Sequence, residues 1–109
     1  MRNMRAQTAI LHDCSVQVFA GFMSKQLSWK DTLDSNPVPK IGAVGREKLA
    51  EKDGITSPVQ LIGQYLILQG DEDEFVEYLM ECGLRKQEIT ADNGALAAIR
   101  EKVSVFCTP

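Results

Sequence analysis

The hydrophobic positions of this chain recur at helical spacing, and no segment alternates convincingly as a strand would. Trp29 and Leu33 are four positions apart within residues 24–34 and predict a short helix there. From Ala95 onward, apolar residues return every three or four positions, which is the pattern of an amphipathic C-terminal helix: Leu96, Ile99, Val103 and Phe106. The whole pattern predicts an all-α fold of about five short helices.

The segment Pro58–Gln69 is apolar on almost every side of a helix. A helix of this kind is buried on every face, and a chain of 109 residues has few elements with which to cover it. The pattern therefore indicates a second chain against one side, the alternative being a central core helix in a monomer. Gly63 in its middle costs about 1 kcal/mol relative to alanine, which indicates a close approach of another backbone.

Turn and cap residues divide the chain between these helices. Gly54 follows a helix-forming run, where a left-handed C-terminal cap is expected, and Thr56–Pro58 provides an N-cap followed by proline. Asp71 and Glu74 have the spacing of a capping box. Their acidic run is therefore interpreted as a helix start rather than as a metal site. Gly83 is expected to end that helix.

Charge is unevenly distributed along the chain. The net charge of −3 argues against a simple polycation that coats nucleic acid. Residues 53–82 carry seven anions and no cation, whereas residues 23–52 carry six cations and four anions. The acidic total therefore does not exclude binding of DNA by the mildly basic part. We interpret residues 1–22 as a flexible or weakly helical extension, with organelle targeting as an alternative, and residues 23–109 as the helical domain.

Catalytic, metal and disulfide chemistry find little support in the residues. The three cysteines, Cys14, Cys82 and Cys107, are widely spaced and odd in number, which favours reduced thiols. His12 is the single histidine, so neither a zinc ligand set nor a base beside a nucleophile is indicated. No apolar stretch approaches the ~20 residues of a membrane span. We expect no enzyme activity, metal, cofactor, small-molecule substrate or membrane partner.

The most informative segment is Lys40–Lys52, in which two glycines three positions apart precede a helix-forming run. Ile41–Gly45 offers the hydrophobic-glycine pattern of a helix-hairpin-helix turn with one extra residue. Glycine lets backbone approach a ligand closely, and the unpaired N–H groups of the next helix attract phosphate. Cations flank that point: Lys40, Arg46 and Lys48. Such a turn binds the nucleic-acid backbone without reading bases.

The run Gly63–Leu68 is followed by the acidic residues Asp71–Asp73 and then by Phe75 and Leu79. On this run, which is the strongest match, the segment from Asn36 to Phe106 resembles the barrier-to-autointegration factor family. Further matches are Asn36-Pro37-Val38, Ile41-Gly42 with Val44, Lys48-Leu49, Gly54, Cys82-Gly83, Lys86-Gln87 and Arg100-Glu101.

The resemblance implies a compact five-helix, SAM-like domain that contains a helix-hairpin-helix and forms a symmetric homodimer. It implies that each subunit holds one DNA duplex by its phosphates, so that the dimer bridges two duplexes. By residue match, the DNA-binding positions are Lys25, Lys40, Ile41, Gly42, Ala43, Val44, Gly45, Lys48 and Lys86. The dimer positions are Leu61, Ile62, Gly63, Tyr65, Leu66, Ile67 and Tyr78.

The chain departs from the family pattern at defined places. Lys40 stands where the family turn has its first glycine, which would re-register the turn onto Gly42 and Gly45. The family also offers a groove at the dimer interface to LEM-domain proteins of the nuclear envelope. In that groove Glu74 replaces a leucine, and Gln69 and Met80 replace lysines.

The favoured function is a non-enzymatic, sequence-independent double-stranded DNA-binding and bridging protein of chromatin, in the nucleus and cytoplasm. One alternative is a helical protein-interaction module of the same fold. A second is a helix-hairpin-helix accessory subunit of a DNA-repair complex.

Overall fold

The computed structural model describes residues 14–105, with side chains from Gln17 onward. This part of the chain contains no strand, and the all-α prediction is confirmed. Its helices are α2 (Cys14–Ser24), α3 (Ala43–Asp53), α4 (Pro58–Ile67), α5 (Glu72–Glu81), α6 (Lys86–Ile89) and α7 (Ala95–Ser104). The described residues thus form six helices rather than about five, because the polar segment after Gly83 contains the short α6.

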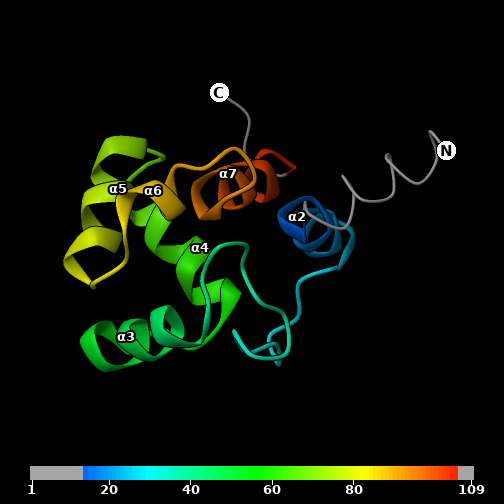
Figure 1. Cartoon of the computed structure of the whole chain (residues 1–109), viewed down its shortest axis with the longest axis horizontal. Helices are drawn as coiled ribbons and strands as arrows, with labels where there is room; N and C mark the ends of the chain where they lie inside the picture. The colour runs from blue at the N-terminus through cyan, green and yellow to red at the C-terminus, as the bar shows by residue number, and fades with distance from the viewer. Residues whose placement is uncertain (1–13, 106–109) are drawn as a thin grey trace, which may run out of the picture.

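Helix α4 runs through the middle of the molecule, with α3 on one side of it and α5, α6 and α7 on the other (Figure 1). It packs against α5 and α7, and α2 packs on α7. Large side chains of the core come from α4, α5 and α7: Leu61, Phe75, Leu79 and Ile99, all fully buried. Phe75 meets the ring of Tyr65 edge-on, with 5.1 Å between ring centroids, which joins α5 to α4.

Most of the predicted helix boundaries are confirmed by their hydrogen bonds. The Ser57 hydroxyl accepts from the N–H of Gln60, whose side chain returns to the N–H of Ser57 at 3.1 Å. Gly54 caps α3 in the left-handed conformation, with φ of 67°. Asp71 accepts from the N–H of Glu74 at 3.1 Å. Its own N–H donates to Leu68 instead, so the reciprocal half of the predicted capping box is absent there.

The predicted helix over residues 24–34 is wrong, because the chain from Lys25 to Gly42 is irregular. Short polar side chains bind the nearby backbone in this segment and compete with helical hydrogen bonds. The Asp31 carboxylate accepts from the N–H of Ser28, and the Thr32 hydroxyl accepts from the N–H of Ser35, both at 3.1 Å.

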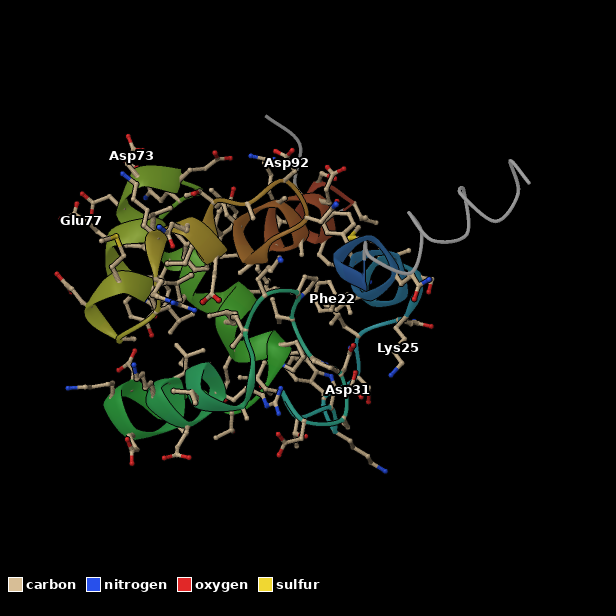
Figure 2. The ribbon with its side chains drawn as sticks, viewed as in Figure 1. Phe22, Lys25, Asp31, Asp73, Glu77 and Asp92 are labelled. Atoms are coloured by element: carbon tan, nitrogen blue, oxygen red, sulfur yellow. The ribbon has the colours of Figure 1, made fainter. Side chains whose placement is uncertain are left out.

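A helix forms earlier in the chain, at Cys14–Ser24, and runs across the boundary we drew at Met23. Phe22 points from α2 toward the body of the molecule (Figure 2) and is buried in the core. The Lys102 ammonium of α7 lies 5.3 Å from the centre of the Phe22 ring. The remainder of the predicted extension, with His12, lies outside the described residues, as do Phe106 and Cys107 at the other end.

Candidate nucleic-acid interface

The turn before α3 is formed by Val38–Ile41, and Lys40 takes its left-handed position. The N–H of Ile41 donates to the carbonyl of Val38 at 3.1 Å. Lys40 has φ of 66°, and it follows Pro39. Proline at the second turn position and a positive φ at the third are typical of a type II turn, in which glycine usually takes the third place. Lys40 therefore takes the backbone position that glycine usually occupies in such a turn.

The expected re-registration of the turn onto Gly42 and Gly45 is wrong. Gly42 has an extended backbone, with φ of −84° and ψ of −169°, and is the N-cap of α3. Gly45 lies inside the first turn of that helix. A Cβ on Gly45 would lie 3.2 Å from the Cγ2 of Ile41, so Gly45 provides room for a core side chain. Ile41 is buried and Pro39 sets the turn. Packing beneath the turn therefore decides that Lys40, and not Gly42, takes the left-handed position.

The first turn of α3 presents backbone donors without an acceptor from its own cap. The first helical bond to Gly42 comes from the N–H of Arg46 at 2.9 Å, and Gly42 has no side chain with which to accept from other donors. The N–H groups of Ala43, Val44 and Gly45 precede that bond and point out of the helix end. The positive end of the helix dipole lies at the same place, so this end can bind an anion.

A concave site of about 440 Å³ lies at this helix end, and we call it the hairpin cleft. Its far wall is the turn between α5 and α6, which includes Gly83 and Arg85. The Lys48 ammonium crosses to that wall and donates to the carbonyl of Gly83 at 3.2 Å. The complete lining is Lys40, Gly42, Ala43, Val44, Gly45, Lys48, Gly83, Leu84, Arg85 and Glu88. Six of the nine predicted DNA-binding residues therefore lie together.

Three predicted DNA-binding residues do not line the hairpin cleft. Ile41 is buried beneath it. Lys86 is exposed at the start of α6, next to Arg85. Lys25 is exposed on the irregular segment, where its ammonium donates to the carbonyl of Ser35 at 3.2 Å (Figure 2).

Arg46, which we had grouped with the cations of the turn, faces away from the hairpin cleft. Its Nε lies 2.9 Å from a carboxylate oxygen of Asp34. Its guanidinium also donates to the carbonyl of Ile41 at 3.4 Å. Arg46 thus connects α3 to the irregular segment before it.

Sequence reasoning missed Arg85 as a cation of this site. Arg85 is the N-cap of α6 and pairs with Glu88 at 2.9 Å, both side chains being substantially exposed. The basic pair at positions 85 and 86 was a signal, but the sequence contains no sign that it faces α3. Gly83 allows the approach, because its φ is 109° and a Cβ there would lie 2.7 Å from the Cδ of Lys48.

The predicted dimer residues of α4 divide between two faces. Leu61, Ile62 and Tyr65 are buried inside the subunit. Gly63, Leu66 and Ile67 form what we call the outer face of α4. Leu66 is 39% exposed and Ile67 is 73% exposed. Within one chain, α4 is therefore covered on one side only, and the outer face, which the sequence pattern assigned to a second chain, is exposed. Tyr78, the remaining predicted dimer residue, is half-buried and donates to the Asp53 carboxylate.

The groups whose pKa is displaced lie outside the hairpin cleft. Burial and the hydrogen bond to Asp53 raise the pKa of Tyr78 far above its ordinary value. Burial raises the pKa of the Cys82 thiol and lowers the pKa of the Lys102 ammonium. Within residues 14–105, no group of acidic, histidine or cysteine side chains is arranged to hold a metal ion. The cleft thus offers backbone donors and fixed cations, which suit phosphate binding.

A family model matches most of the chain. Residues 14–103 match the family model described as barrier to autointegration factor, of the SAM_BAF type. No match was found among curated proteins or among solved structures. In the part of the chain that the structure describes, no helix has the length and apolarity needed to cross a membrane.

Proposed function

The chain belongs to the barrier-to-autointegration factor family, a family of non-enzymatic DNA-binding proteins of chromatin, and from this premise we propose that it binds and bridges double-stranded DNA without sequence preference. Each subunit holds one duplex in its hairpin cleft, and a homodimer joins two duplexes. The proposed sites of action are the nucleus and the cytoplasm.

The observation that carries the proposal is the uncapped start of α3 inside a cleft with three cations. The N–H groups of Ala43, Val44 and Gly45 point outward, and Lys40, Lys48 and Arg85 line the same site. Backbone donors and a helix dipole bind phosphate oxygens and carry no information about base sequence. The cleft is therefore suited to a DNA backbone rather than to base edges.

The distribution of charge supports local rather than long-range attraction. Glu88 is the one acidic residue in the lining of the hairpin cleft, and it pairs with Arg85. The ion pair between Arg85 and Glu88 lies at the surface and is worth at most about 1 kcal/mol. Arg85 can therefore leave it and form a charge-assisted hydrogen bond with a phosphate instead. Lys25 and Lys86 are predicted DNA contacts that lie outside the hairpin cleft.

Replacement of Gly42 by valine tests the phosphate contact. A Cβ on Gly42 would have no atom within 4 Å, and its φ of −84° suits any residue, so Gly42→Val is expected to fold normally. The added side chain would stand between the α3 amides and a phosphate. Loss of one charge-assisted hydrogen bond lowers affinity roughly tenfold or more, measured by fluorescence anisotropy of a labelled duplex.

Gly21→Val is the matched control, because a Cβ on Gly21 of α2 also has no atom within 4 Å. It is expected to leave DNA affinity unchanged. If Gly42→Val binds DNA as tightly as the unaltered protein, the start of α3 is not the contact.

The outer face of α4 supports the homodimer. Ile67 is 73% exposed, so Ile67→Asp removes no contact of the core. We expect the variant to sediment as a folded monomer that binds one duplex and no longer joins two. A variant that remains a dimer would place the interface elsewhere. Binding of LEM-domain proteins stays a prediction.

A further inference from the structure

An apolar groove of about 340 Å³ lies where the irregular segment passes the outer face of α4. We call it the Trp29 groove. Leu27, Ser28 and Trp29 form one wall, and Val59, Ile62, Gly63 and Leu66 of α4 form the other. No charged residue is in this lining. A groove without charges offers nothing to a DNA backbone, whereas it can accept an apolar side chain of another protein surface.

Trp29 is held in an exposed position beside this groove. It is 89% exposed, although burying an aromatic ring is strongly favourable. The segment that carries it is fixed by hydrogen bonds on both sides. The N–H of Ser28 donates to Asp31 at 3.1 Å, and the N–H of Lys30 donates to the Ser28 hydroxyl at 3.2 Å. The ring is thus presented to the outside by an ordered loop, as binding residues commonly are.

Gly63 has no role inside the subunit that requires a glycine. A Cβ on Gly63 would have no atom within 4 Å, yet glycine in a helix costs about 1 kcal/mol relative to alanine. The space it leaves lies in the Trp29 groove. This groove therefore has a recess at Gly63 and a projecting ring at Trp29 on the same face.

We propose that the occupant of the Trp29 groove is a second copy of this chain, with the Trp29 ring of each subunit seated against Gly63 of its partner. This inference rests on the proposed homodimer and names the contact that closes it. A two-fold interface needs one patch that carries both a projection and its recess, and Trp29 and Gly63 satisfy that condition. The uncharged lining also lets two acidic chains approach without like-charge repulsion there.

Trp29 is the single tryptophan of the sequence, so intrinsic fluorescence reports its burial directly. We expect the emission of the full chain to shift to shorter wavelength, and quenching by acrylamide to weaken, as the protein concentration rises through the dimer dissociation constant. The Ile67→Asp monomer should keep an exposed, readily quenched tryptophan at every concentration.

Trp29→Ala should raise the dimer dissociation constant at least about tenfold, as expected for an aromatic residue central to an interface. Lys30→Ala is the matched control in the same loop and should leave it unchanged. Because Trp29 is almost fully exposed in the subunit, its removal should not change thermal unfolding of the dilute monomer or affinity for a single duplex.

Three outcomes would overturn the proposal. If the protein sediments as a dimer while its tryptophan stays exposed, the Trp29–Gly63 contact is refuted and the homodimer remains supported. A protein that is monomeric at all accessible concentrations would refute both. A monomer whose tryptophan emission moves only when a different protein is added would assign the groove to that partner.

Discussion

Lys40 holds a backbone conformation that side chains of its kind rarely adopt. Its φ of 66° lies in the left-handed region, where a residue with a Cβ is disfavoured by roughly 1–2 kcal/mol. The turn retains this geometry because Pro39 and the buried Ile41 fix it on both sides. In this position, Lys40 is part of the lining of the hairpin cleft and adds an ammonium group to it. Phosphate binding would explain why a strained lysine stands at a glycine position.

Replacement of Lys40 by glycine is expected to stabilise the fold and weaken DNA binding. Relief of the strain should add about 1 kcal/mol to the free energy of unfolding, or roughly 4–8 °C in Tm for a domain of this size. Lys40→Ala, which removes the charge and keeps the strain, should show the loss of DNA affinity without the gain in stability. Equal melting temperatures for the two variants would contradict the strain argument.

At the scale of elements, individual polar side chains connect helices that are distant in the sequence. Lys102 of α7 donates to the carbonyls of Met23 and Lys25 at the end of α2. Tyr78 of α5 donates to the carboxylate of Asp53, the last residue of α3. Arg100 of α7 pairs with Glu72 at the start of α5, at 3.2 Å. These contacts orient helices whose apolar faces alone would allow several arrangements.

Removal of the Lys102 ammonium should release α2 from α7. Lys102→Met keeps the volume of the side chain and leaves the end of α2 without its donor. We expect a loss of about 1–3 kcal/mol in the free energy of unfolding, measured by urea denaturation. Faster amide exchange should be concentrated in α2, whereas Arg100→Met, on the exposed side of α7, should leave α2 unaffected. Uniformly faster exchange throughout the domain would contradict a local role.

The contact between α3 and α5 should be visible in the dependence of stability on pH. Burial raises the pKa of Tyr78 above its ordinary value near 10, so above pH 10 the unfolded chain loses this proton while the folded chain keeps it. The free energy of unfolding therefore falls as the pH rises above 10. Tyr78→Phe should show a shallower fall, measured by urea denaturation from pH 8 to pH 11. Cys82 and Lys102 still titrate in both proteins, and identical slopes would contradict this assignment.

At the scale of the whole molecule, most of the acidic residues gather on α5, and the turn after α5 forms one wall of the hairpin cleft. Asp73 and Glu77 on α5 lie at the opposite end of the molecule from Lys25 and Asp31 (Figure 2). Six of the seven anions of residues 53–82 lie in α5 or at its N-cap, and the seventh, Asp53, ends α3. Three cations line the hairpin cleft. An acidic protein with such a site should approach DNA slowly and hold it through few contacts.

The salt dependence of DNA binding follows from this count of cations. With Lys40, Lys48 and Arg85 neutralising about three phosphates, the logarithm of the association constant should fall with the logarithm of salt concentration at a slope of about −3. Anisotropy titrations of one duplex between low and moderate salt would measure it. Lys48→Gln should reduce the slope by about one. A slope near zero would exclude the phosphate contact and favour a protein-interaction module.

Residues close together in the sequence determined most helix boundaries of this protein. Asp71 at the start of α5, Gly54 at the end of α3 and the pair Ser57–Pro58 at the start of α4 act through bonds that span at most a few positions, and such bonds can be inferred from spacing alone. The family was also evident from the run Gly63–Leu68 and the acidic residues after it, and residues 14–103 match its model.

Only the tertiary structure decided the register of the turn, the cations of the cleft and the exposed side of α4. Lys40 remains left-handed because of packing beneath the turn, and Arg46 leaves the cleft because Asp34 lies beside it. Arg85 joins the cleft across about forty residues of sequence because Gly83 allows Lys48 to approach. Each of these depends on side chains that meet from distant segments, and local spacing contains no information about such meetings.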